Sequence, residues 1–277
     1  MSAKNILKYP GSKWTIAAWI VSHFPAGYEH MSYLEPYFGS GAVFFSKNRS
    51  VIETLNDIDS NVVNLFRVAR DYPHELANAV YLTPWAREEY QQSYLDDATD
   101  HIEKARRFLV RMWQAIGAKS STSTGWRKNV KGVNGNVPRF HTSLPDDILQ
   151  VADRLKHAAG NYIVQIEKGD AVELIKRHNT AETLIYADPP YMLDTRKNVK
   201  IYKHEYTEED HVQLLEVLMA HPGKVLLSGY DNELYNSMLS DWYRAETQAR
   251  AESAQMRIEV VWCNYQSAVQ GELWGKR

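Results

Sequence analysis

The chain has few of the residues that build disulfides and metal sites. Its 277 residues include one cysteine, Cys263, and ten histidines at no paired metal-ligand spacing. A single cysteine excludes an intrachain disulfide and is typical of a reducing compartment, and we predict no metal site. No apolar run approaches the roughly 18 residues that cross a bilayer, and the first residues lack the apolar core of a signal peptide. We therefore expect a cytoplasmic protein without a membrane-spanning segment.

An excess of positive charge is also missing. Lys and Arg together number 32 and Asp and Glu 34, which leaves a formal net charge of −2. A strongly basic chain would indicate nucleic-acid binding, so here any such surface has to be a local patch. Hydrophobic residues make up 44% of the chain, enough to bury a core. The length predicts one large α/β domain with an insertion or a small second domain.

The most informative motif is a predicted strand that ends in an acid, two prolines and an aromatic residue. The apolar run 183–187 leads directly into Asp188, Pro189, Pro190 and Tyr191. Neither proline has an N–H and both fix φ, so the chain leaves the strand as a rigid loop with free carbonyls. Such a loop can offer a carboxylate, a carbonyl and a flat ring to one nucleobase with an amino group. The alternative is a plain turn with Tyr191 packed in the core.

A second motif, at residues 32–45, reads as strand, tight glycine turn and helix. Gly39 and Gly41 let the backbone approach a ligand closely at a helix N-terminus. The next predicted strand, 51–55, is followed by Asp57, 18 residues after Gly39. An acid about 20 residues after the glycine turn reaches a ribose hydroxyl in doubly wound sheets. The motif therefore predicts a nucleotide-type cofactor site, although Asp57 could instead cap the helix that follows.

Taken in order, four motifs resemble those of the Dam-like (D12 class) DNA adenine N6-methyltransferases of phages and bacteria. They are Lys8-Tyr9-Pro10-Gly11-Ser12-Lys13, Glu35-Pro36-Tyr37-Phe38-Gly39-Ser40-Gly41, Asn56-Asp57 and Asp188-Pro189-Pro190-Tyr191. The resemblance covers roughly residues 1–70 and 160–265 and is weaker between them. It implies S-adenosylmethionine as the methyl donor and adenine in double-stranded DNA as the substrate. Enzymes of this class include phage-borne, restriction-modification and orphan methyltransferases.

The resemblance also implies roles for single residues. The residues that it assigns to the cofactor are Tyr9, Lys13, Phe38, Gly39, Gly41, Asp57, Asp170 and Asp188. Asp57 would bind the ribose, and Asp170 would lie beside the adenine ring of the cofactor. The chain departs from the family pattern at Tyr9, where Trp is frequent, at Ser12, which replaces a glycine, and at Ala171, where an aromatic residue is common. Without the resemblance, Lys13 would read as a solvated residue at a helix start and Tyr9 as a packing residue.

Periodicity predicts an α/β fold: a doubly wound, Rossmann-like methyltransferase sheet with a closing antiparallel hairpin and a mostly helical insert. Outside the insert we expect helices at 13–23, 60–70 and 207–220, strands at 51–55, 161–166, 184–187 and 224–227, and the hairpin at 242–249 and 257–265. Between 71 and 158 the alternation stops, and helical patterns occur at 84–93, 100–116 and 144–158. We predict a catalytic domain of residues 1–70 and 159–277. The inserted domain, 71–158, is the target-recognition region by resemblance.

Basic and aromatic residues suited to DNA contact occur in the insert. Lys and Arg bind phosphates or guanine edges, and Trp can wedge or stack. The candidates there are Lys119, Trp126, Arg127, Lys128, Lys131 and Arg139. A second basic stretch follows the tetrapeptide, with Arg196 and Lys197 as candidates and Tyr206 nearby, and could close over a flipped base. Either stretch could instead be an ordinary solvated loop.

The implied reaction is direct methyl transfer to a poor nucleophile, because the lone pair of the adenine amine is delocalised into the ring. The Asp188 carboxylate and the Pro189 carbonyl would accept its two N–H bonds, and Tyr191 would stack on a flipped base. Methyl transfer to another amine, in RNA adenine, cytosine N4 or a protein amide, stays open. A nicotinamide oxidoreductase lacks its usual third small residue, because Phe44 occupies that place. A non-catalytic DNA-binding module would need neither motif.

Overall fold

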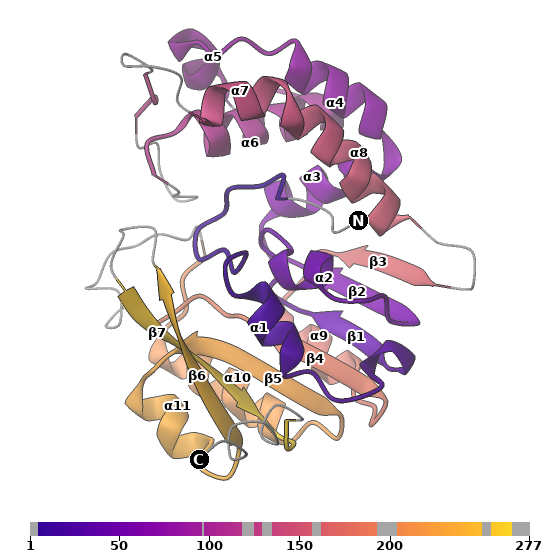
Figure 1. The fold of residues 1–277 in the computed structure, drawn as a ribbon, viewed down its shortest axis with the longest axis vertical. Coiled ribbons are helices and arrows are strands. Elements are labelled where there is room, and N and C mark those ends of the chain that lie inside the picture. The colour runs from indigo at the N-terminus through magenta and orange to yellow at the C-terminus, as the bar shows by residue number, and fades with distance from the viewer. Residues whose placement is uncertain are drawn as a thin grey trace, which may run out of the picture.

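The computed structural model describes residues 5–95, 97–117, 125–128, 135–156, 162–192, 204–250 and 256–267. Within these ranges a seven-stranded sheet forms the centre, in the order β3-β2-β1-β4-β5-β7-β6 (Figure 1). Strands β1 to β5 run parallel, and β7 runs antiparallel between β5 and β6. The strands are β1 (Ser32–Glu35), β2 (Ile52–Asn56), β3 (Ile163–Glu167), β4 (Thr183–Ala187), β5 (Lys224–Tyr230), β6 (Tyr243–Arg250) and β7 (Met256–Cys263).

Helices cover both faces of the parallel strands, which explains why these strands are apolar runs. Tyr33 and Leu34 are neighbours on β1, yet they belong to two different cores, as the two-residue period of a strand requires. The elements packed on the Tyr33 side are α1 (Ala17–Ser22), the short 3-10 helix η1 (Tyr28–His30), α2 (Ala42–Ser46) and α3 (Ser60–Asp71). Those on the Leu34 side are α9 (Ala171–Arg177), α10 (Glu208–Met219) and α11 (Glu233–Met238).

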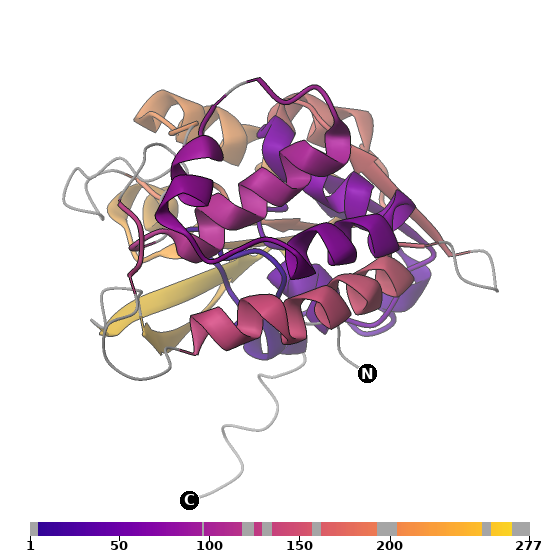
Figure 2. The same cartoon turned by 90° about the horizontal axis from the view of Figure 1, so that it is seen from above.

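A layer of helices inserted between β2 and β3 stands at one end of the sheet (Figure 1, Figure 2). Its members are α4 (Pro73–Tyr81), α5 (Arg87–Gln92), α6 (His101–Gln114), α7 (Asn136–His141) and α8 (Ser143–Leu155). Their apolar faces meet around Trp113, Phe140 and Ile148, which are fully buried or nearly so. These residues belong to the same core as Leu55 of β2. The helical layer is therefore packed onto the sheet domain and does not stand apart on a linker.

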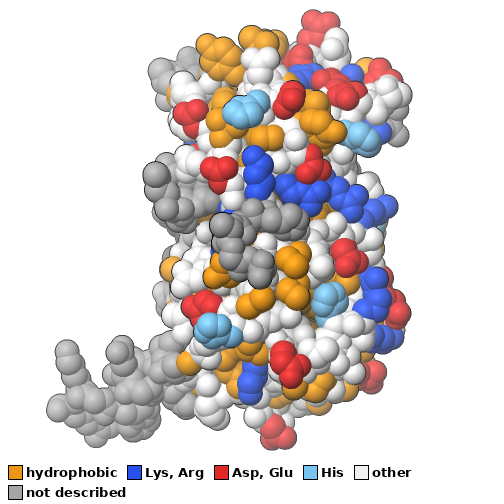
Figure 3. Space-filling model, turned by 90° about the vertical axis from the view of Figure 1, so that its right-hand side faces the viewer, with side chains coloured by type: hydrophobic (Ala, Val, Ile, Leu, Met, Phe, Trp, Pro, Cys, Tyr) orange, Lys and Arg blue, Asp and Glu red, His pale blue; other side chains and the backbone are white. Residues whose placement is uncertain are grey.

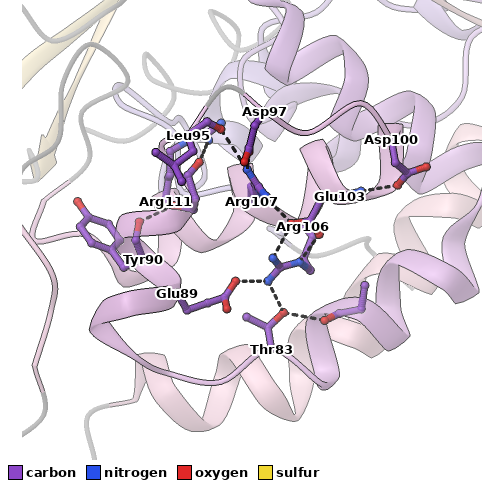
Figure 4. A network of polar contacts seen from close by, with 12 residues as sticks. Thr83, Glu89, Tyr90, Leu95, Asp97, Asp100, Glu103, Arg106, Arg107 and Arg111 are labelled. Atoms are coloured by element: carbon purple, nitrogen blue, oxygen red, sulfur yellow. Dashed lines mark hydrogen bonds and ion pairs between the residues drawn. The ribbon is translucent and has the colours of Figure 1, made fainter.

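Charged side chains hold the outer helices of this layer together (Figure 4). Helix α5 buries only Tyr90, so apolar packing does little to fix it. The Arg106 guanidinium of α6 binds Glu89 of α5 and, at 2.7 Å, Glu103. Arg107 binds Glu103 at 2.6 Å and also Asp97. Single exposed pairs contribute little, but a network in which side chains are shared orders its members together.

The sequence predicted most elements but missed several short helices. The closing hairpin is confirmed, and so is the capped helix α10, where Thr207 and Asp210 form a reciprocal capping box. The predicted helix at 13–23 begins only at Ala17. Helices α4, α7, α9 and α11 were not expected. α7 lies in a polar stretch without clear periodicity, and helices of only six to nine residues give a weak periodic pattern. In the described part of the chain no helix is long and apolar enough to cross a membrane.

Candidate active site

The carboxyl ends of β1, β2, β3 and β4 open into one cleft. β4 pairs with β1, although β2 follows β1 in the chain, and such a reversal of strand order leaves a crevice at the carboxyl ends. The cleft encloses about 830 Å³, part of it open to solvent. All the residues that were predicted to hold the cofactor line it except Gly41. These lining residues are Tyr9, Lys13, Phe38, Gly39, Asp57, Asp170 and Asp188.

Both glycines of the turn adopt left-handed backbone angles, for two different reasons. Gly39 has φ 49°, and a Cβ there would approach the Tyr9 ring to 3.2 Å. Gly41 has φ 69°, and a Cβ there would meet the rings of Phe38 and Phe45 at 2.5 to 2.7 Å. Gly39 thus borders the cleft, whereas Gly41 makes room for the aromatic rings that pack under the turn.

Asp57 is tied to the glycine turn and does not cap the next helix. Its Oδ2 accepts a hydrogen bond of 2.9 Å from the Gly39 N–H, and its Oδ1 accepts one of 2.8 Å from the Asp59 N–H. Asp59 caps α3 instead, accepting from the Asn61 N–H at 3.0 Å. Burial raises the pKa of Asp57 to about 6, although the N–H bonds from Asp59 and Gly39 oppose the shift. The alternative interpretation of Asp57 as a helix cap is wrong.

Asp188 is held from two sides at the end of β4. The Lys13 ammonium lies 2.9 Å from its Oδ2, and the Ser228 hydroxyl donates to its Oδ1 at 3.0 Å. Lys13 also donates to the Gly11 carbonyl at 2.7 Å and is 5% exposed, so it is no solvated helix-start residue. The Asp188 side chain stays 18% exposed. The carboxylate is therefore fixed in direction yet open to the cleft.

Tyr191 is buried beside Asp188. Its ring is 6% exposed and its centroid lies 4.2 Å from that of Tyr230. The Lys13 ammonium lies 4.5 Å from the Tyr191 ring centroid. The Tyr191 hydroxyl donates a hydrogen bond of 2.8 Å to Glu259. The prolines complete the turn, and Pro190 lines the cleft.

Two buried acids near this site were not singled out from the sequence. Glu35 ends β1, lines the cleft and accepts a hydrogen bond of 2.6 Å from the Tyr33 hydroxyl. Burial raises the pKa of Glu35 to about 8, against the opposing effects of Tyr33 and Lys47. Glu259 lies on β7, in an alternating strand pattern where a glutamate reads as solvent-facing. Glu35 lies within the second motif, so the sequence could have indicated it as a site residue. No motif surrounds Glu259, so the sequence near it gave no indication of such a role.

Residues 9–256 match the family described as D12 class N6 adenine-specific DNA methyltransferase. The chain belongs to this family. The methyltransferase acts on DNA, where it methylates the N6 amino group of adenine. The resemblance that the four motifs carried is thereby confirmed, as is the prediction of an enzyme.

Two relatives cover most of this methyltransferase. The type II methyltransferase M1.LlaDCHI of Lactococcus lactis subsp. cremoris is 26% identical over 260 residues, which cover 87% of this chain and 86% of the relative. The type II methyltransferase M.MjaIII of Methanocaldococcus jannaschii is 25% identical over 236 residues, covering 77% and 78%. A solved structure of the rRNA methyltransferase aviRa from Streptomyces viridochromogenes aligns over 93% of this chain and 87% of its own, at 13% identity. The TM-score of this alignment is 0.42.

Half of the DNA-binding candidates of the methyltransferase can be placed. Lys119, Lys131, Arg196 and Lys197 lie outside the described residues. Trp126 donates to the Gln114 side chain at 3.0 Å, and the Arg127 guanidinium donates to the Ala115 carbonyl at 3.1 Å. Arg139 donates to the Asn5 carbonyl at 3.2 Å, and Lys128 is exposed. Tyr206, near the second basic stretch, lines the cleft.

A cationic cluster joins the N-terminal segment to the helical layer. The Lys8 ammonium lies 4.0 Å from the Trp113 ring centroid and donates to Asn136, and the Arg139 guanidinium lies 5.3 Å from the same ring. Burial, together with the charges of Arg127 and Arg139, lowers the pKa of Lys8 to about 8. The three cations therefore lie close enough to repel one another. A concentration of like charge of this kind favours binding of an anion.

Proposed function

We propose that the protein transfers the methyl group of S-adenosylmethionine to the N6 amine of an adenine flipped out of double-stranded DNA. The observation that carries this proposal is the Asp188 carboxylate, which lines the cleft while Lys13 and Ser228 fix both of its oxygens. A carboxylate held in this way can accept an N–H bond from a neutral amine without reorganising.

The residues of the cleft fit S-adenosylmethionine. The cofactor bears a sulfonium, an ammonium and ribose hydroxyls, and the cleft offers acids to each: Glu35, Asp57, Asp170 and Asp188 all line it. We assign Asp57 to the ribose, Asp170 to the adenosine end and Tyr9, Lys13 and Phe38 to the walls. When bound, the cofactor supplies a methyl group activated by the sulfonium. Gly39 belongs to this site because its missing Cβ leaves the turn open beside Tyr9.

The chain's contribution to the transfer is positioning and charge. We assign Asp188 and the Pro189 carbonyl as acceptors of the two N–H bonds of the adenine amine, which localises the nitrogen lone pair for in-line attack. The Lys13 ammonium, which lines the cleft and lies 2.9 Å from Asp188, supports this assignment, because it is an N–H donor that the carboxylate already accepts. The bound cofactor would supply the methyl group and leave as the neutral thioether, and the Asp188 carboxylate would stabilise the positive charge that the amine nitrogen gains. One amine proton would then pass to solvent.

Flipping the adenine costs a few kcal/mol, and stacking on Tyr191, worth roughly 1–3 kcal/mol, offsets much of it.

We further propose that residues 71–158 form the target-recognition domain and residues 1–70 with 159–277 the catalytic domain. Lys8, Arg127 and Arg139 would contact the phosphates. On the side of the molecule that faces the viewer in Figure 3, Lys and Arg side chains gather in a band across the middle, in a chain whose net charge is −2. Local basic surfaces therefore occur on this chain although its net charge is negative.

Because both relatives carry the name of type II methyltransferases, we propose that this protein is the modification enzyme of a restriction-modification system.

Replacing Asp188 tests the proposed chemistry. Asp188→Ala should lower kcat for transfer of labelled methyl from S-adenosylmethionine to duplex DNA by roughly 100- to 1,000-fold, the usual cost of losing a group that stabilises transition-state charge. Its circular dichroism spectrum should match that of the wild type. Asp231→Ala is the matched control, since Asp231 is an exposed acid just after β5. Turnover near wild type in Asp188→Ala would falsify the assigned role.

A further inference from the structure

A buried glutamate from the closing hairpin reaches the Asp188–Tyr191 turn. Glu259 lies on β7 opposite Tyr230 of β5 in the antiparallel register, and it is 7% exposed. Its Oε2 accepts the hydrogen bond of 2.8 Å from the Tyr191 hydroxyl, across 68 residues of sequence. Glu259 is not one of the residues that line the cofactor cleft. Its contact is therefore with the ring proposed for the target base and not with the cofactor site.

Burying an acid at this position has a cost that an apolar residue would avoid. Burial raises the pKa of Glu259, while the charge of Lys13 and the hydrogen bond from Tyr191 act in the opposite direction. A strand that only needed to pack against Tyr191 and Tyr230 could carry a valine or leucine there at no desolvation cost. Two of the groups that compensate the acid, Lys13 and Tyr191, belong to the active site, and a third, Arg257, lies on the same strand. The contacts with Lys13 and Tyr191 link the presence of Glu259 to that site.

A hydrogen bond to the hydroxyl holds the far end of the Tyr191 side chain and resists a swing about its Cα–Cβ bond. Rotation of the ring about Cβ–Cγ is limited instead by the groups packed beside it, the Tyr230 ring at 4.2 Å and the Lys13 ammonium at 4.5 Å. Lys13 in turn binds Asp188 at 2.9 Å. A ring displaced from this position would disturb both the stacking surface and the cation that orients the acid.

We propose that Glu259 is a positioning residue that fixes the Tyr191 ring for stacking of the target adenine. The proposal rests on the proposed function, in which the base lies against Tyr191 with its amine at Asp188. Glu259 lies outside the residues that line the cleft, so its proposed role is indirect. It acts through the Tyr191 hydroxyl, because a small misplacement of the base moves the amine away from the in-line direction.

Single and double variants test this role. Tyr191→Phe removes only the donated hydrogen bond and should lower kcat on duplex DNA roughly 5- to 10-fold, the range expected for one hydrogen bond. Glu259→Val should give a loss of similar size. The double variant should lose no more than the larger single loss, because both changes break the same contact. Glu259→Gln, which keeps an acceptor oxygen, should restore most of the activity, and the affinity for S-adenosylmethionine, measured by calorimetry, should stay within about twofold in all four.

The control is Glu246→Gln, an exposed glutamate on the neighbouring strand β6. Wild-type kcat in both Tyr191→Phe and Glu259→Val would overturn the proposal, and so would losses that add fully in the double variant. If Glu259→Val does not fold, Tyr191→Phe with Glu259→Gln still decides, since neither changes the packing volume much. Should Asp188→Ala remain inactive while these variants are fully active, only the role of Glu259 fails and the proposed function stands.

Discussion

At the scale of single residues, the cleft gathers acids whose charge the protein controls by burial. Glu35 and Asp57 both have raised pKa values because they are removed from water, and Asp188 is balanced by Lys13. A neutral Glu35 avoids a second bare carboxylate near Asp188 in the free protein.

Glu35 should make the stability of the free protein depend on pH. The folded chain keeps the Glu35 proton up to about pH 8, whereas an unfolded glutamate releases it near 4.5. Its stabilising contribution is therefore complete below pH 4.5 and is lost as the pH rises to 8. As the pH rises from 5 to 8, the free energy of unfolding of the wild type should fall by a few kcal/mol more than that of Glu35→Gln, since one pKa unit corresponds to about 1.4 kcal/mol. Urea unfolding at several pH values measures this difference.

Glu75→Gln, a change at an exposed glutamate of α4, provides the comparison for a surface charge. Parallel stability curves for the wild type and Glu35→Gln would show that Glu35 is ionised in the folded state at neutral pH.

At the scale of elements, the N-terminal segment joins the helical layer to the catalytic turn. The Trp113 indole donates to the Ile6 carbonyl at 2.9 Å, and Lys8 lies over the same indole. Five residues later, Lys13 binds Asp188. In Figure 1 this segment runs from the helices down to the sheet. One short stretch of chain thus contacts both the proposed DNA surface and the proposed catalytic acid.

The cationic cluster of Lys8, Arg127 and Arg139, together with the exposed Lys128 next to Arg127, should bind DNA phosphates. Lys8→Gln and Lys128→Ala should each weaken binding to all duplexes and reduce the slope of log K against log salt by about one per lost contact. Affinity for S-adenosylmethionine should not change. Lys224→Ala is the control, because Lys224 is the first residue of β5 and so lies at the amino ends of the parallel strands, away from the carboxyl ends that form the cleft. Titrations of several duplexes at two salt concentrations give these values.

If a variant loses about 1–3 kcal/mol of binding free energy only on duplexes of particular sequence, the changed residue contacts the edge of a guanine base. Unchanged affinity in both variants would remove this surface from the DNA interface.

At the scale of the whole molecule, a buried ion pair ties the helical layer to the sheet. Arg154 of α8 binds both oxygens of Glu53 on β2, at 2.6 and 2.7 Å, and Glu53 also binds Lys47. The Glu53 side chain is fully buried. Burial alone would raise the pKa of Glu53, but the bonds from Arg154 and the charge of Lys47 outweigh it and lower that pKa. The pair's contribution is therefore present above about pH 4.5 and is lost as the pH falls.

Breaking this pair should destabilise the layer and the sheet together. Arg154→Met leaves the Glu53 carboxylate buried with less compensation and should lower the free energy of unfolding by about 3–5 kcal/mol. Arg177→Met is the matched control, since Arg177 forms an exposed pair with Glu167 and should cost less than about 1 kcal/mol. Chemical denaturation should give one transition in each case, because the two parts share a core. Separate transitions for the helical layer and the sheet would contradict this coupling.

Features that depend on local backbone chemistry could be predicted from the amino-acid order alone. Two consecutive prolines end β4 whatever the surrounding fold, because neither can donate a backbone hydrogen bond to a neighbouring strand. Gly39 and Gly41 permit a left-handed turn, and apolar runs predict buried parallel strands. From these the α/β sheet, its closing hairpin and most of the cleft residues could be predicted. The assignment of residues 71–158 as a separate domain stays a prediction, as do the catalytic roles.

Which of these groups meet depends on how distant segments of the chain pack together. Lys13 was predicted to open a helix, yet it lies in a loop against Asp188. Glu259 resembled any glutamate of an edge hairpin until β7 placed it beside Tyr191. Glu35 takes its raised pKa from burial that no local pattern reveals. Long-range pairing and desolvation depend on how distant segments pack, so the charge states and contacts of the site are properties of the fold and not of the motifs.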